Sequence, residues 1–564
     1  MAAMKHPVPG SNGKPARSAA APAQTEPAEV IVVGSGAAGG WAAKTFSEAG
    51  LRVLVLEAGP ELPADDGAHP LRMAKRISKV LSGRQRTQGF HPGYWGSDPD
   101  LWVDDIDYPV KYPPDAPFYW MRGNQVGGRT VLWGGVALRL SDYELQGATR
   151  EGFGFDWPVT YEELAPAYDR IEVALRVHGT AEKLPQLPDG RFVHAHPLTA
   201  SEQRLREALE RAWPDRRLIP CRGIDGNEPP DPGQKFNRLS SCGSTLADAL
   251  RTGKTTLRPN SLVTHILPAD GGARASGVAY IDTETGARRE AHARLVVLCA
   301  SAISSVLILL RTAAESSNGP LADLPALGHY IMDHVCAASM VSLPDMPYEA
   351  PAPRTGADSF LVPRFQNLDA RAQDYRGGFG LWGTLQREGF HSFPGMRSAL
   401  GFVVAHGDME PRFENRVELA GDRDIWGLQV PYIDCRFSEN DLAMRKAMRQ
   451  SLEEVLGQAG GKARTMLGAL NFPGPWRLVA QLEEGWKAPP PGSYAHEVGG
   501  ARMGKDSKTS VVDPRNRCWG MPNVLVTDGA CWPTAGWQNP ALTIMAVTVR
   551  ACELAVGSMK AGEL

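Results

Sequence analysis

After the first 28 residues, strand-like and helix-like patterns of apolar residues follow each other closely. An apolar run at 29–33 leads into a glycine-rich turn, a helical pattern at 41–49 and a second apolar run at 52–56. Short apolar runs on either side of a helix are typical of a β-α-β unit, whose strands are parallel. The pattern therefore predicts a parallel sheet with crossover helices.

Strand-like and helical segments alternate again further along the chain. Helical patterns lie at 161–177, 201–212, 302–311 and 543–556, and strand patterns at 256–266, 275–281, 294–299 and 523–527. Residues 60–114 are turn-rich and aromatic, so we expect a long excursion over the surface. Residues 341–493 carry prolines, aromatics and broken strands in place of the α/β pattern. The expected fold class is α/β with an inserted α+β domain.

These patterns divide the chain into discontinuous domains. The expected nucleotide-binding domain is Rossmann-like and comprises residues 28–150, 216–340 and 494–564, and the expected substrate-binding domain comprises 151–215 and 341–493. Residues 1–27 are rich in alanine, proline, serine and glycine and lack the apolar core of a signal peptide. We expect this segment to be a disordered tail.

Composition narrows the classes of function. A chain of 564 residues is longer than one hydrophobic core usually supports, so more than one domain is expected. A content of 43% apolar and 22% charged residues is typical of a globular protein. A net charge of −3 without a long basic stripe argues against a nucleic-acid partner. The chain has no uninterrupted apolar run of membrane-spanning length, so no membrane span is expected. Eight cysteines without regular spacing are typical of reduced thiols, which favours the cytoplasm.

The turn after the first predicted strand has the spacing of a dinucleotide-binding site. Gly34, Gly36 and Gly39 fit G-x-G-x-x-G, in which the glycines permit a sharp turn, a close pyrophosphate and tight helix packing. The following helix offers free N–H groups and a partial positive charge to the phosphates. Glu57 ends the second strand, where a carboxylate can accept hydrogen bonds from a ribose diol. The motif leaves NAD and FAD open, and the absence of a following arginine disfavours NADP.

Five sequence blocks occur in order along the chain. They are G-S-G-A-A-G-G with L-E-A-G at 34–40 and 56–59, R-G-N-Q-V-G-G-R-T-V-L-W-G-G at 122–135, V-V-L-C-A-S-A-I-S-S at 296–305, G-H-Y-I-M-D-H at 328–334, and H-E-V-G-G-A-R-M-G at 496–504. Together they resemble the glucose-methanol-choline oxidoreductases, and the resemblance spans nearly the whole chain after the tail. It implies an FAD-binding Rossmann-like domain, an inserted substrate-binding domain and FAD-dependent oxidation of an alcohol.

The resemblance also implies which residues contact the FAD. The expected cofactor-binding residues are Gly34, Ser35, Gly36, Ala37, Ala38, Gly39, Glu57, Ala58, Arg122, Gly128, Thr130, Trp133, Gly134, Gly135, Val263, Ala300, Asp528, Gly529, Pro540 and Thr543. Asp528 and Gly529 are expected against the pyrophosphate or the ribityl chain. In pyranose oxidases of this family, a histidine after the V-G-G segment holds FAD covalently. Leu132 occupies that position here, and residues 122–138 contain no histidine or cysteine, so we expect non-covalent FAD.

Within the family, the C-terminal blocks are similar to those of pyranose oxidases, glycoside 3-oxidases and sugar dehydrogenases. In that branch a histidine before G-G pairs with an asparagine in N-P-x-L-T, and these are His496 and Asn539 here. A histidine can take the proton of an alcohol as its hydride leaves for flavin N5. Asn539 is expected to position the substrate oxygen by a hydrogen bond. His265, His334 and His406 are expected to have structural or supporting roles, although His406 could face the sugar pocket.

The spacing of cysteines and histidines predicts no metal site. Some sugar dehydrogenases of this branch hold an iron–sulfur centre through a cluster of cysteines, whereas residues 217–245 contain only Cys221 and Cys242. Neither C-x-x-C nor H-x-x-x-H spacing occurs in the chain.

The expected reaction is oxidation of a sugar or glycoside ring hydroxyl, at C2 or C3, to a keto-sugar. O₂ or another electron acceptor would reoxidise the flavin, and the identity of that acceptor stays open. A non-sugar alcohol (sterol, aryl or aliphatic) is an alternative, because the aromatic stretch at 94–120 would cover sugars and apolar groups alike. A lyase that keeps FAD as a scaffold and an inactive FAD-binding protein are further alternatives. The presence of both His496 and Asn539 argues against the inactive protein.

Overall fold

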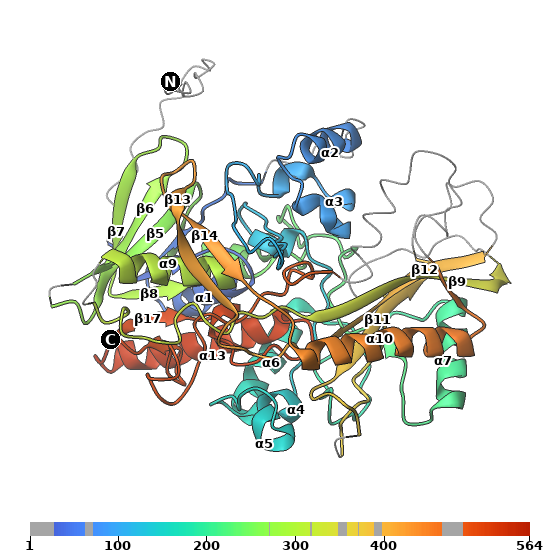
Figure 1. Cartoon of the computed structure of the whole chain (residues 1–564). Coiled ribbons are helices and arrows are strands. Elements are labelled where there is room, and N and C mark those ends of the chain that lie inside the picture. The colour runs from blue at the N-terminus through green and yellow to red at the C-terminus, as the bar shows by residue number, and fades with distance from the viewer. Residues whose placement is uncertain are drawn as a thin grey trace.

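A computed structural model describes residues 27–62, 72–269, 271–315, 319–347, 358–369, 372–387, 398–464 and 489–564. The expected disordered tail at 1–27 lies outside these ranges except for Pro27. Two large sheets lie at opposite sides of the molecule in Figure 1, and the helices α2 and α3 lie between and above them.

The predicted β-α-β unit is confirmed and forms the centre of a six-stranded sheet. β1 (Val30–Val33) pairs in parallel with β2 (Val53–Leu56) and β8 (Leu295–Leu298). The other strands are β4 (Thr255–Arg258) and β17 (Met521–Val526), which are parallel, and β16 (Arg517–Cys518), which is antiparallel. The side chains of β1 and β8 are buried throughout, as in parallel strands covered on both faces.

Helices pack together beside this sheet. α1 (Ala37–Glu48) contacts α13 (Ala541–Lys560) and α8 (Thr245–Arg251), and α6 (Tyr161–Leu175) contacts α13. By length and composition α13 could cross a membrane, since its most apolar stretch has a mean hydropathy of 1.4. Of that stretch 67% is buried inside the protein, as in the core helices of large domains.

A smaller antiparallel sheet extends this half of the molecule. It contains β5 (Ser261–Pro268), β6 (Ala275–Asp282) and β7 (Arg288–His292). β7 was not predicted because its sequence R-R-E-A-H exposes every side chain except Ala291, which leaves no apolar pattern. α9 (Ala302–Glu315) packs against β5 and against the hairpin of β13 (Arg416–Arg423) and β14 (Gln429–Asp434).

The second large sheet has six antiparallel strands and belongs to the other half. In order they are β15 (Lys462–Arg464), β9 (Val335–Pro347), β12 (Ser398–Gly407), β11 (Phe379–Leu385), β10 (Phe360–Val362) and β3 (Ile219–Pro220). α10 (Glu439–Gln458) packs on β9 and β12, and α7 (Ala200–Ala212) packs on α10 and β11. β3 lies in a segment expected with the nucleotide-binding domain, yet it pairs with β10.

The turn-rich stretch at 60–114 differs from a simple surface excursion. It contains α2 (Arg72–Leu81) and α3 (Pro92–Gly96). Tyr94 and Trp102 are buried there against Met121 in a small cluster of their own. Aromatic side chains bury large areas, so a few of them stabilise a segment whose turn residues conceal any periodicity. Two short helices follow, α4 (Asp142–Leu145) and α5 (Gly147–Glu151).

Candidate active site

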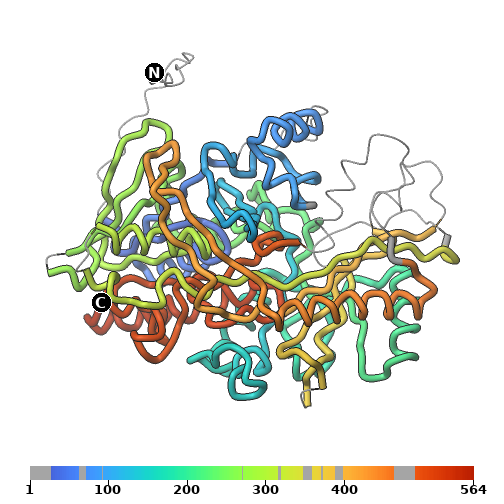
Figure 2. The backbone as a smooth tube through the Cα atoms, in the orientation of Figure 1, coloured from blue at the N-terminus to red at the C-terminus, as the bar shows by residue number. Residues whose placement is uncertain are grey.

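A cavity of about 2170 Å³ lies between the two halves and is lined by residues from 33 to 544. In Figure 2, blue, green and red parts of the chain meet around the middle of the molecule. Sites for a single drug-sized ligand occupy roughly 300–1,000 Å³. This cavity therefore has room for a dinucleotide and a second molecule beside it.

The glycine turn between β1 and α1 forms one end of the cavity wall. Gly34 has φ +101°, and a Cβ there would lie 2.4 Å from the carbonyl oxygen of Cys299. A Cβ on Gly39 would lie 1.9 Å from the carbonyl oxygen of Gly34, so α1 packs directly on the turn. Gly36 precedes α1 and provides no side-chain cap, which leaves N–H groups of the first helical turn available to a ligand. This geometry fits a pyrophosphate held at a helix N-terminus.

Glu57 follows β2 at the same end of the cavity. Its carboxylate accepts hydrogen bonds from the Ser35 N–H at 2.9 Å, the Ser35 hydroxyl at 2.6 Å and the Gly59 N–H at 3.0 Å. Burial raises the pKa of Glu57, while the hydrogen bonds from Gly59 and Ser35 act in the opposite direction. Besides facing the cavity, Glu57 therefore ties the glycine turn to β2, a contact that the spacing of the motif did not predict.

The segment at 122–135 crosses the cavity next to the turn. Gly127 and Gly128 have φ +90° and +52°, and the Gly127 N–H donates to the Ser35 hydroxyl at 2.9 Å. The Thr130 hydroxyl donates to the Gly127 carbonyl at 2.6 Å, and the Trp133 ring N–H donates to Leu239 at 2.9 Å. The bond to Ser35 ties the segment to the turn, and the other two fix its own course along the cavity wall.

Nearly all of the predicted cofactor-binding residues lie on the cavity wall. These are Gly34, Ser35, Gly36, Ala37, Ala38, Glu57, Ala58, Arg122, Gly128, Thr130, Trp133, Gly134, Gly135, Val263, Ala300, Asp528, Gly529 and Pro540. Gly39 lies behind the wall, where it permits the packing of α1. Thr543 also lies behind it, fully buried, with its hydroxyl 2.6 Å from that of Tyr168.

Both predicted catalytic residues are on the wall as well. His496 Nδ1 and Asn539 Oδ1 are buried without a hydrogen-bond partner among the described residues. Buried polar atoms are normally paired, so two orphans on one cavity are expected where a bound molecule completes the site. The remaining histidine on the described wall is His91, whose pKa is lowered to about 4 by burial and by Arg129.

A cluster of rings surrounds His496. Its ring centroid lies 4.9 Å from that of His334 and 4.7 Å from that of Tyr494, and His406 lies 5.5 Å from His334. Burial lowers the pKa of His334 to about 4 and that of His406 to about 3. Burial, followed by the two neighbouring histidines and Arg129, lowers the pKa of His496 well below 6.5. His496 is therefore neutral at neutral pH and can accept a proton.

Asp333 holds the loop that carries His496. Its carboxylate accepts backbone N–H groups from Gly492 at 2.8 Å, Tyr494 at 3.2 Å and His496 at 3.1 Å. Burial and the nearby Glu497 raise the pKa of Asp333 to about 7. Sequence analysis did not assign this role, although Asp333 lies in the fourth quoted block, immediately before His334.

Arg129 fixes the other side of the same loop. It donates to the Ala495 carbonyl and to the Glu497 carboxylate, both at 2.7 Å, and to the Ser301 hydroxyl at 3.0 Å. Glu497 is fully buried, whereas Arg129 is partly exposed on the cavity wall. The guanidinium of Arg129 therefore lies beside the cavity, and the sequence did not predict a role for this residue. His265, expected to be structural, lies on β5 with its ring 3.0 Å from the Thr264 hydroxyl.

The second sheet supplies the remaining wall. Side chains of β9, β11 and β12 that line the cavity are Cys336, Ala338, Ser339, Met340, Trp382, Phe402 and Val404. Arg449, Leu452 and Glu453 of α10 also lie on the wall. This part of the cavity is thus largely apolar and aromatic, with one charged residue of each sign.

The comparisons with known proteins agree with this arrangement. Residues 28–336 match the N-terminal model of GMC oxidoreductases and residues 411–548 match the C-terminal model. The chain belongs to the GMC oxidoreductase family. The predicted family resemblance and α/β fold class are confirmed, and as a GMC oxidoreductase the protein is an FAD-dependent alcohol oxidoreductase.

Relatives of this GMC oxidoreductase act on several alcohols. It is similar to a 2-methyl-1,2-propanediol dehydrogenase of Mycolicibacterium austroafricanum, with 28% identity over 93% of this chain and 94% of that one. It is 27% identical to a C-glycoside 3-oxidase of Microbacterium trichothecenolyticum, over 94% of this chain and 96% of the relative. The structure of pyridoxine 4-oxidase from Mesorbium loti shares the fold with a TM-score of 0.61 at 18% identity, covering 93% and 99% of the two chains.

Proposed function

We propose that this GMC oxidoreductase oxidises a ring hydroxyl of a sugar or glycoside, at C2 or C3, to a keto-sugar. The observation that carries the proposal is that His496 and Asn539 both line the cavity and each has a buried polar atom without a partner among the described residues. The similarity to a C-glycoside 3-oxidase and to a paromamine 6'-oxidase of Streptomyces fradiae supports a sugar substrate.

His496 is the proposed base of the reaction. FAD, when bound, supplies the hydride acceptor. His496 is neutral because its pKa lies well below 6.5, so its ring can take the proton of the substrate hydroxyl. Asp333 and Arg129 hold the loop of His496 from two sides, which keeps the ring in place relative to the substrate.

Asn539 is the proposed positioning group for the substrate oxygen. It precedes α13, whose first residues Ala541 and Ile544 also line the cavity. A rigid helix start holds the amide with little freedom, so a hydrogen bond from it costs little reorganisation as charge develops on the oxygen. The proposed pocket for the rest of the substrate is the apolar wall of the second sheet, with Trp382 as the aromatic residue that would cover a sugar ring.

A small non-sugar alcohol is the second candidate substrate. The apolar residues Met340, Phe402 and Val404 favour it, as does the similarity to a diol dehydrogenase. Anaerobic mixing of the holoenzyme with substrate panels separates the two candidates. Glucose, methyl glycosides and C-glycosides form one panel, and 1,2-diols, aryl alcohols and sterols form the other.

We expect the sugars to reduce the flavin at least ten times faster than the diols do, as measured by the loss of oxidised flavin absorbance. Faster reduction by a diol or aryl alcohol would replace the proposal by the second candidate. No reduction by any alcohol, with turnover of a cyanohydrin, would indicate a lyase. Reoxidation of the reduced enzyme by O₂ and by a quinone then identifies the electron acceptor.

A further inference from the structure

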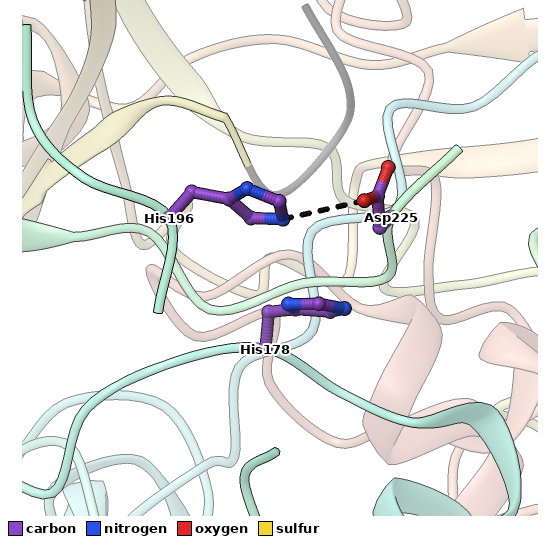
Figure 3. A group of neighbouring side chains, drawn as sticks. All are labelled: His178, His196 and Asp225. Carbon is purple, nitrogen blue, oxygen red and sulfur yellow. Dashed lines mark ion pairs between the residues drawn. The ribbon is translucent and has the colours of Figure 1, made fainter. Parts of the chain in front are cut away.

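Three side chains with metal-binding atoms gather behind the cavity wall. His178 follows α6, His196 precedes α7, and Asp225 follows β3. Their ligand atoms all lie within 4.8 Å of one another, and Figure 3 shows the ring of His178 lying beneath that of His196, with Asp225 beside both. The two rings are stacked with centroids 4.6 Å apart, and His194 lies 4.5 Å from His178.

Backbone hydrogen bonds tie the three segments together. The His178 N–H donates to the Gly223 carbonyl at 2.7 Å, and the Gly223 N–H donates back at 3.0 Å. The Gly179 N–H donates to the His194 carbonyl at 3.2 Å. Main-chain pairing therefore holds the backbone of these segments close together without a bound ion, and the side chains can still rotate.

Three of the four imidazole nitrogens of His178 and His196 lack hydrogen bonds to the described residues. The side chain of His178 is 1% exposed, and neither of its ring nitrogens has a hydrogen-bond partner among the described residues. His196 Nε2 is also buried and unpartnered. Burying a polar atom without a partner is costly, so three such atoms in one place call for a ligand.

We propose that His178, His196 and Asp225 bind a divalent transition-metal ion, and that Zn²⁺ is the ion their chemistry favours. Two imidazoles and a carboxylate are typical zinc ligands, with bonds of about 2.0–2.2 Å. In a tetrahedron with bonds of that length, two ligand atoms lie about 3.3–3.5 Å apart. His196 Nε2 and Asp225 Oδ2 are already 3.5 Å apart, and the wider separations close by side-chain rotation.

Neighbouring carboxylates complete the site. Asp358 Oδ1 lies 3.1 Å from His196 Nδ1, which orients the ring with Nε2 towards Asp225. Metal-binding histidines commonly donate their second ring N–H to a carboxylate in this way. Glu228 Oε1 lies 3.6 Å from His178 Nε2 and is the candidate for the fourth position.

The ion would brace the wall of the active-site cavity. Asp225 and Glu228 flank Gly226 and Asn227, and both of these lie on that wall. Zn²⁺ has no redox chemistry, so its role here would be to fix the wall. The site has no signature in the sequence, because its three ligands come from separate loops and no spacing motif links them.

Metal binding by the tag-free, full-length holoenzyme tests the proposal. After dialysis against EDTA, Zn²⁺ should bind in a ratio of about one per chain, and Co²⁺ should give the visible absorption of a tetrahedral site. Asp225→Asn and His178→Gln should each weaken Zn²⁺ binding by at least about 100-fold, beyond the loss typical of an outer-shell change. His292→Gln is the matched control, since His292 is an exposed histidine 3.4 Å from Glu290, and should bind Zn²⁺ as the wild type does.

The proposal is overturned if the wild type binds no Zn²⁺ or Co²⁺ in stoichiometric amount, or if both variants bind as tightly as His292→Gln. Flavin content and circular dichroism report folding of the variants. If His178→Gln does not fold, Asp225→Asn decides, because it keeps the shape of the side chain. If neither folds, the Co²⁺ spectrum of the wild type decides, since an octahedral or absent spectrum contradicts the site.

Discussion

The two parts of the cavity wall are built on different principles. The part formed by the β1–α1 turn and residues 122–135 is rich in glycine, and Gly34 leaves no room there for a methyl group. The part around His496 presents buried side chains, and the ring of His334 contacts it from a distant segment. Substitutions that enlarge a side chain should therefore disturb the first part most, and substitutions that truncate a side chain should disturb the second part most. Substitutions of these two kinds separate cofactor binding from chemistry.

The largest expected effect is on the backbone part. In Gly34→Ala, the left-handed φ and the clash with Cys299 cost about 3 kcal/mol or more, which is over a hundredfold in FAD affinity. The purified variant should contain almost no flavin by absorbance. Gly50→Ala is the control, because Gly50 has φ +91° but open space around a Cβ, and it should retain flavin. Equal flavin content in the two variants would contradict the proposed pyrophosphate site.

Removing the base should give the next largest effect. His496→Ala should keep FAD but slow anaerobic flavin reduction by at least about 10²-fold, the usual size of general-base loss. Stopped-flow absorbance of the oxidised flavin measures this rate. His265→Ala is the control, because it removes a histidine on β5, and its flavin should be reduced at the wild-type rate. A near-normal rate in His496→Ala would falsify the assignment of the base.

Asn539→Ala should have a smaller effect on the same rate. It removes one oriented hydrogen bond but leaves the base, so we expect reduction slowed by about 10- to 100-fold. The substrate concentration at half-maximal rate should rise as well, because the amide also positions the oxygen. A rate lower than that of His496→Ala would reverse the two proposed roles.

Glu57 should affect cofactor affinity alone. In Glu57→Ala, the buried turn loses hydrogen bonds to a charged group worth about 1.5–3 kcal/mol, so FAD should bind about 10- to 100-fold more weakly. At saturating FAD the reduction rate should equal that of the wild type. A slow variant at saturating FAD would show that Glu57 has another role.

Acid precipitation of the wild type should leave the flavin in the supernatant, as expected for non-covalent FAD.

The smallest expected effect is that of pH on the chemical step. The base works when it is neutral, and the pKa of His496 lies well below 6.5. The limiting rate of flavin reduction should therefore stay constant as the pH falls from about 8 to about 6.5 and decline only below that value. Stopped-flow reduction at saturating substrate gives the profile. A decline centred at or above pH 6.5 would mean that a different group limits the rate.

Local signals in the sequence predicted the strand–turn–helix unit at the expected nucleotide site. The glycine turn, α1 and the strand ending at Glu57 are contiguous, so their spacing determines their geometry. Thr543 shows the limit of transferring residues from a family motif. Ala541 and Ile544 lie on the cavity wall, whereas Thr543 lies about 200° around the helix from Ala541 and contacts Tyr168 of α6.

Contacts between distant segments were not predictable from spacing. Asp333 accepts a hydrogen bond from the backbone of His496, which lies 163 residues further along the chain. Arg129 reaches Glu497 across 368 residues. Asp333 and Arg129 lie in quoted blocks, but spacing within a block does not reveal which distant residue each one contacts, because these hydrogen bonds form only once the two halves have packed. The same is true of β3, a two-residue strand whose assignment depends on β10.

The order of the strands has a consequence for how the protein is made. β17 pairs with β8, and the loop of His496 lines the cavity, yet both lie in the last part of the chain. During synthesis, the glycine turn leaves the ribosome long before these elements exist. Until then β8 presents an open edge to which other strands could add. FAD capture should therefore be one of the last events of biogenesis, and chains that stall before residue 494 should need chaperones to avoid aggregation.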